Sequence, residues 1–147
     1  MFGVDSVTRS LHVHWAGAFA ACPTVHPGQE IDTAGPTAWV ELWVEAWDEQ
    51  LRRNVSQERM ALAVTAQCFS RHLSETAEVR RAVDAARAAL AMQLVEIRDY
   101  DQSGAPLLGF ARLREAEVRD LTRMHDDGSR GGLRHLVVFC RGIAEEV

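Results

Sequence analysis

Apolar residues recur at helical spacing in two segments of the chain. In residues 5–20 an apolar residue returns every third or fourth position, and Asp5 or Ser6 is placed to cap the start. The apolar positions there are Val7, Leu11, Trp15 (or His14), Ala18 and Phe19, and Pro23 follows as a stop. Residues 75–93 carry a second stripe, which begins after Ser74 as N-cap and contains Val79, Ala82, Val83, Ala86 and Leu90. The pattern predicts two amphipathic helices, and the many alanines of the second favour close packing on a sheet.

The segment TAWVELWVEAW, residues 37–47, alternates instead with a period of two. On a strand, one face would hold Trp39, Glu41, Trp43, Glu45 and Trp47, and the other Val40, Leu42, Val44 and Ala46. The three tryptophans would align on a helix as well, because a step of four residues is nearly one turn. A strand is favoured over a helix, since valine and tryptophan are good strand formers.

The next segment, ERMALAVTAQCFS, alternates too and supports the strand interpretation of its neighbour. One of its sides holds Met60, Leu62, Val64, Ala66 and Cys68. The polar residues 50–57 between the two segments predict a hairpin connection. Further strands are predicted at 24–27, 94–100, 107–124 and 133–143, although the second half of 107–124 also suits a helix. We expect a single α+β domain over residues 1–147, with a largely antiparallel sheet flanked by an N-terminal helix and a central alanine-rich helix.

The charged residues narrow the classes of function. All 16 basic residues are arginines, so the chain has no lysine for a phosphate-binding loop or a Schiff base, and GSRGG (residues 128–132) is not a nucleotide loop. A net charge of -5 with dispersed arginines does not predict nucleic-acid binding, which needs clustered cations. No apolar stretch approaches the length of a membrane span, and the N-terminal residues do not have the pattern of a secretory signal. The three scattered cysteines predict free thiols in a cytosolic product.

Candidate chemistry is sparse. His12 and His14 form an H-x-H with His26 downstream, but residues two apart on a helix point away from each other and would not share a metal ion. Glu115 and Glu117 are typical of a solvated strand face rather than an acid–base pair. No nucleophile motif is present. We therefore predict no catalytic residue, no cofactor and no metal site.

The tryptophan-rich face is the least ordinary feature. It suits a core poorly, because its two glutamates would be buried at a cost in free energy. It can serve as a platform for a carbohydrate or small ligand. It can also be covered by the N-terminal helix, or by a neighbouring subunit with the glutamates at the wet rim. Covering by protein is the more natural of these interpretations.

The order and length of the predicted elements resemble a known family. A helix is followed by PTAWVELWVEAW, the return strand ERMALAVTAQCFS, the helix AEVRRAVDAARAAL and the final strand GGLRHLVVFCRGI. This layout resembles the tail terminator (tail completion) proteins at the head–tail neck of long-tailed phages. The resemblance covers most of the chain but contains no diagnostic motif, and the richness in tryptophan departs from it.

The resemblance implies a structural virion protein, made in the host cytoplasm, and not an enzyme. Such proteins form hexameric rings that cap the tail tube and dock the head connector, while DNA passes through without specific binding. The candidate interface residues are Trp39, Trp43 and Trp47, with Asp127, Ser129 and Arg130 of the glycine-rich loop HDDGSRGG. The alternatives are a different head–tail connector ring protein, or an intracellular α+β small-ligand binder or enzyme with a pocket lined by tryptophan and histidine.

Overall fold

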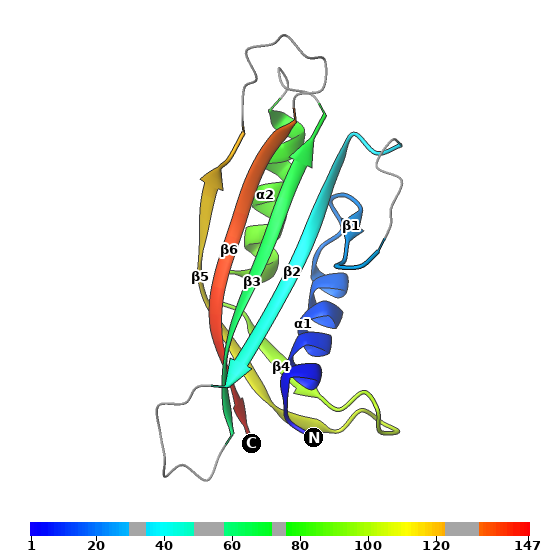
Figure 1. Cartoon of the computed structure of the whole chain (residues 1–147), viewed down its shortest axis with the longest axis vertical. Helices are drawn as coiled ribbons and strands as arrows, with labels where there is room; N and C mark the ends of the chain where they lie inside the picture. Colours follow the sequence, from blue (N-terminus) through cyan, green and yellow to red (C-terminus); the bar gives the residue numbers. More distant parts are fainter. Residues whose placement is uncertain (30–34, 49–57, 72–75, 123–132) are drawn as a thin grey trace.

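The computed structural model describes residues 1–29, 35–48, 58–71, 76–122 and 133–147. The elements follow the predicted order (Figure 1). Their bounds are α1 (Val4–Ala18), β1 (Thr24–Val25), β2 (Ala38–Asp48), β3 (Arg59–Ser70), α2 (Ala77–Leu90), β4 (Leu94–Arg98), β5 (Leu107–Asp120) and β6 (Arg134–Glu146). Neither of these helices is long and apolar enough to cross a membrane.

The strands of the described ranges form one sheet in the order β1-β2-β3-β6-β5-β4. Only the short β1–β2 pair is parallel, and the other neighbours are antiparallel. The prediction of a strand rather than a helix at 37–47 is confirmed, and β2 pairs with β3 from Ala38 opposite Ser70 to Asp48 opposite Met60. The alternative prediction of a helix in the second half of 107–124 is wrong. Pairing with β6 keeps β5 extended as far as Asp120.

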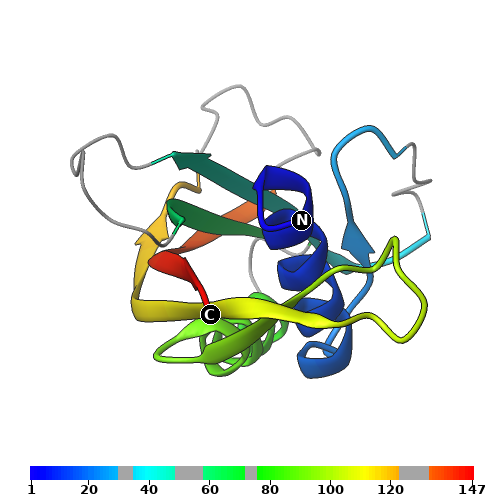
Figure 2. The ribbon, with the colours of Figure 1, turned by 90° about the horizontal axis from the view of Figure 1, so that it is seen from below.

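Both helices lie on one face of the sheet, as predicted. α2 packs against the central strands, whereas α1 packs against both β2 and β4. β2 and β4 stand near opposite ends of the strand order. The sheet therefore curls around α1, which is visible in the view along the strands (Figure 2). The architecture is a single α+β domain, and the described helices cover one face of its sheet.

The core lies between the helices and the covered face of the sheet. The predicted apolar sides of β3 and α2 are buried there, together with Val40 and Leu42 of β2. On α1 the buried stripe contains Val7, Leu11 and Trp15, so Trp15 rather than His14 faces the core. Full burial of each such side chain stabilises the fold by roughly 1.5–3 kcal/mol.

The ends of the helices differ in detail from the predicted ones. The N-cap of α1 is Gly3 rather than Asp5 or Ser6, and the Ser6 hydroxyl accepts a hydrogen bond from the Gly3 amide at 2.9 Å. α1 ends at Ala18, ahead of Pro23, because Phe19 turns into an extended conformation and stacks on Trp15. α2 begins after Thr76; the predicted cap Ser74 lies outside the described residues.

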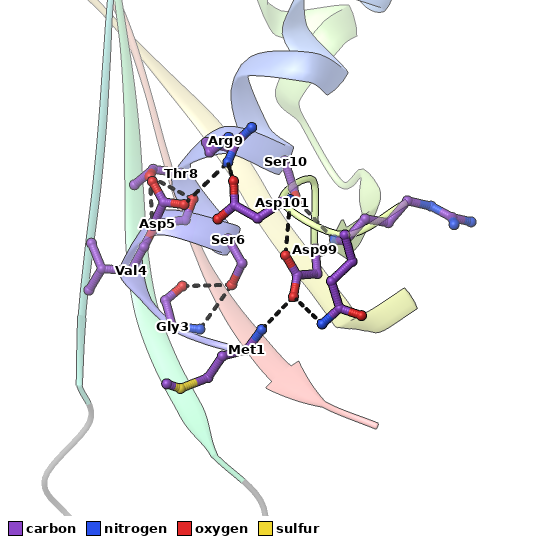
Figure 3. Close-up of polar contacts among 12 residues, drawn as sticks. Met1, Gly3, Val4, Asp5, Ser6, Thr8, Arg9, Ser10, Asp99 and Asp101 are labelled. Carbon is purple, nitrogen blue, oxygen red and sulfur yellow. Dashed lines mark hydrogen bonds and ion pairs between the residues drawn. The ribbon is translucent and has the colours of Figure 1, made fainter. Parts of the chain in front are cut away.

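Polar contacts fix the first turns of α1 to the end of β4 (Figure 3). The Met1 ammonium group lies 2.7 Å from the buried carboxylate of Asp99, which lowers the pKa of that carboxyl group. Arg9 pairs with Asp101 at 2.6 Å. The Ser10 hydroxyl accepts a hydrogen bond from the Arg98 amide at 3.0 Å. These contacts join segments about ninety residues apart in sequence.

Two glycines allow β5 and β6 to lie close together. A Cβ atom on Gly109 would collide with the backbone of Glu145 and Glu146. A Cβ atom on Gly142 would lie 2.7 Å from the carbonyl oxygen of Arg112. Glycine within a strand often marks such an approach of a neighbouring backbone. Any larger residue at either position would push the two strands apart.

Candidate functional site

The helix-free face of the sheet carries the exposed tryptophans of β2. Residues directly opposite each other on neighbouring strands share a face, so the register lines up rows of side chains across β2, β3 and β6. One row contains Trp39, Phe69 and His135. A second row on the same face, at Trp43, also contains Thr65 and Phe139. The sequence-predicted tryptophan face is therefore this helix-free face.

Trp39 is buried within the chain itself. Its ring stacks on Phe69 with centroids 5.4 Å apart, and Phe69 stacks on His135 at 4.4 Å. The guanidinium of Arg71 lies 5.1 Å from the Trp39 ring centroid on β2. This stack leaves Trp39 with 5% of its surface exposed. The His135 ring is held by Gln67 at 3.0 Å, and burial lowers the pKa of His135.

Trp43 and Trp47, in contrast, are 44% and 48% exposed. The interpretation that the N-terminal helix covers the tryptophan face is wrong, because α1 packs on the opposite face with Val40 and Leu42. The physical reason is the alternation of the strand, because β2 buries Val40 and Leu42 under the helices and therefore directs its tryptophans to the other face. Of the glutamates between the tryptophans, Glu45 is exposed and Glu41 is partly exposed, which lowers the free-energy cost of burying their charges.

Two adjoining grooves cross this face toward β5. The larger has a volume of about 900 Å³, and apolar side chains of Leu121, Val137 and Phe139 form part of its lining. The second, of about 410 Å³, reaches Trp47 and Glu45 on β2. Both grooves are lined by Arg114, Phe139 and Arg141. Among the described residues, Trp47 lines the second groove, and neither groove has a described histidine in its lining.

Charges of both signs alternate around the grooves. Arg114, Arg119 and Arg141 stand beside Glu115 and Glu117 in the lining of the larger groove. The Arg141 guanidinium lies 5.5 Å from the Phe139 ring centroid. Arg119 and Glu117 pair at 3.5 Å with both side chains largely in solvent. A mixed surface of this kind suits a protein partner better than a polyanion, which needs an uninterrupted basic patch.

The three cysteine thiols are held in a protonated state. Burial raises the pKa of Cys22 to about 11 and that of Cys68 to about 12, and it also raises the pKa of Cys140. Thiols with such pKa values stay protonated at neutral pH and are poor nucleophiles. In the part of the chain that is described, no group of three or more metal-binding side chains comes together.

The histidines of the H-x-H motif point in different directions, as predicted for a helix. The His12 ring meets His26 edge to face, with centroids 4.9 Å apart. His14 Nε2 lies 2.8 Å from the carbonyl oxygen of Ala89 on α2. The pair formed by His12 and His26 was not predicted from the sequence, because it depends on how the chain after β1 returns along α1.

The structure separates the predicted interface residues. All three tryptophans lie on the helix-free face, where Trp43 and Trp47 are half exposed and Trp39 is buried by its neighbours. Asp127, Ser129 and Arg130 fall outside the described residues. Phe139, Arg141 and Arg114 were missed as groove residues. The period-two pattern of 133–143 places Phe139 and Arg141 on one strand face and was the available signal for those two.

Comparison of the chain with models of known protein families gives no match, and comparison with curated protein sequences gives none either.

Proposed function

We propose that the chain is a structural protein of the neck of a long-tailed phage or phage-like particle. In this role, copies of it form a ring that caps the tail tube and joins it to the head connector. The observation that carries the proposal is the pair of half-exposed tryptophans, Trp43 and Trp47, on a sheet face that the helices leave free. Aromatic side chains are enriched at protein interfaces, and extended exposed apolar surfaces mark sites of association.

Two further features support an assembly role. The grooves beside the tryptophans combine apolar floor residues such as Phe139 with arginines and glutamates at the rim, which is the usual anatomy of a protein interface. The element order, with a hairpin on each side of α2, is the one on which the resemblance to tail terminator proteins rests. The acidic net charge suits a channel through which DNA moves without being held.

The test is the assembly state of the protein, alone and with purified tail tubes of the phage that encodes it. We expect wild-type protein to form rings, seen by native mass spectrometry, and to bind one end of each tube, seen by electron microscopy. The double variant Trp43→Ala/Trp47→Ala should lose tube binding by about 10-fold or more, the scale of an interface hot spot. Its melting temperature should stay close to that of the wild type, because both rings are already half in solvent.

Val13→Ala is the matched control. Val13 is an exposed apolar residue on α1, away from the helix-free sheet face, so this variant should assemble and bind tubes normally. Wild-type protein that forms no ring and ignores tube ends would refute the neck role. Equal loss of binding in the control and in the tryptophan variant would remove the helix-free face from the interface.

A further inference from the structure

Within the described part of the chain, the second half of β5 has an open edge. β4 pairs with β5 only between Leu107 and Arg112. Just beyond, Met92 and Gln93 bond to Arg114 and Leu113. Among the described elements none pairs with the side of residues 116–120 that faces away from β6 (Figure 1). An open edge presents unpaired N–H and C=O groups and acts as a template for another strand.

The register shows which backbone groups face outward. The Leu121 amide donates to the His135 carbonyl oxygen at 2.8 Å, so the odd-numbered residues here direct their backbone toward β6. Antiparallel strands alternate between hydrogen-bonded and non-hydrogen-bonded pairs. The backbone groups of Ala116, Val118 and Asp120 therefore point to the open side. These three alternate residues are enough for a short ladder of backbone hydrogen bonds with another strand.

The sequence of this edge, A-E-V-R-D, is complementary to itself in the antiparallel direction. With Val118 opposite the partner's Val118, Glu117 stands opposite the partner's Arg119, and Arg119 opposite the partner's Glu117. In the same register, outward-facing residues meet only outward-facing residues, as a hydrogen-bonded ladder requires. The ladder contains about six backbone hydrogen bonds, two for each hydrogen-bonded pair.

We propose that a second copy of this chain pairs antiparallel along β5, with the two-fold axis at Val118. The side chain of Val118 is 40% exposed and becomes covered at the centre of the contact. Glu117 and Arg119 form a solvent-exposed ion pair with each other within the strand. Opposite charges directly across two strands stabilise the pairing, and like charges there destabilise it. The result is one continuous sheet through two subunits.

This contact goes beyond the proposed neck function and does not depend on it. A two-fold contact uses the same patch on both copies, so it adds one subunit and stops. A cyclic ring needs a head-to-tail contact elsewhere, and the tryptophan-bearing β2 side of the face remains free for it. A variant that loses the β5 contact but still forms rings would separate the two proposals.

The test reverses charges at the edge and follows the mass of the folded protein by sedimentation equilibrium. Glu117→Arg and Arg119→Glu each place like charges opposite each other twice, and each should raise the dimer dissociation constant about 10-fold or more. An equimolar mixture of the two variants should form a heterodimer, because every facing pair is then of opposite sign. The double swap Glu117→Arg/Arg119→Glu should dimerise as the wild type does.

Val118→Pro tests the backbone separately. Proline removes an amide that faces the open side, so the β6 ladder and the melting temperature should be largely kept while the dimer is lost. A monomeric wild type would overturn the proposal. A dimer that is equally strong in both single charge variants would overturn it as well, since the contact would then lie elsewhere.

Discussion

The two faces of the sheet differ in how far they bury their apolar side chains, and β2 contributes residues to both. Its Val40 and Leu42 are fully buried beneath the helices, whereas Trp43 and Trp47 stand half exposed on the other side. Two large aromatic side chains are thus left half in solvent. Hydrophobicity alone does not identify the core face of a strand that is apolar on both sides, because either face could pack against the helices.

The alternation of β2 decides which side chains face outward. Residues 40 and 42 lie under the helices, so residues 39, 43 and 47 must point to the other face. On the covered side, Ala82, Ala86 and Ala89 are half of the buried residues of α2 and let that helix lie close to the sheet. The tryptophans of β2 are thus placed outside by the register of the strand, while Trp15 of α1 fills space inside the same core.

The largest expected effect comes from removing an aromatic ring on the covered side. Trp15 is fully buried, stacks on Phe19 at 4.3 Å and donates a hydrogen bond to Thr24. Trp15→Ala should lower the free energy of unfolding by about 4–5 kcal/mol, the upper scale for a buried large aromatic. Urea denaturation measures it. Trp47→Ala, on the free side, is the control and should change stability by less than about 1 kcal/mol. Equal losses would abolish the distinction between the faces.

Trp39 sharpens the comparison, because it lies on the free face yet is buried. We expect Trp39→Ala to cost about 3 kcal/mol, less than Trp15→Ala, since the surface residues Phe69 and Arg71 can settle into the space. The same urea titration measures this difference. A loss as small as that of Trp47→Ala would mean that the stack across β2 and β3 contributes little to the fold.

The smallest expected effect is a difference in acid sensitivity. Burial lowers the pKa of His12, and the nearby His26 lowers it further. The folded state therefore binds this proton less readily than the unfolded chain, so stability falls as the pH drops below about 6.5. Burial also lowers the pKa of His135 on the free face, but Glu41 and Asp120 oppose the shift.

Melting curves recorded between about pH 7.5 and 5 should therefore distinguish two variants. The melting temperature of His12→Gln should fall less between about pH 7.5 and 5 than that of the wild type. His135→Gln should show a smaller change of this kind. The choice of glutamine keeps a polar side chain of similar reach without a titrating group. Unchanged pH dependence in His12→Gln would remove the histidine pair from the acid response.

Much of the fold was predictable because periodicity reports local geometry. The buried stripe of α2 and the alternating side of β3 followed from spacing alone. The end of α1 was not predictable in this way, because Phe19 leaves the helix to stack on Trp15. The extended conformation at the end of β5 was also not predictable, because its local sequence suits a helix. Pairing with β6 makes it a strand.

The candidate site was predictable only in outline. The sequence places Trp39, Trp43 and Trp47 on one face, but their different burial depends on the strand beside them. Register brings Phe69 against Trp39 and the smaller Thr65 against Trp43. Register is a property of paired strands, so a single strand does not reveal which of its aromatic residues will be covered.

The strand order has a consequence for how the protein comes into being. β3, near the middle of the sheet, finds one of its neighbours in β6, the last strand of the chain, and α1 rests on β4. During synthesis, the N-terminal half must therefore wait for partners that are made late. Proteins dominated by contacts between distant parts of the sequence fold slowly, on the order of milliseconds to seconds. In that interval the aromatic strand β2 and the apolar stripe of α1 are exposed, and exposed apolar surface makes a folding chain prone to aggregate.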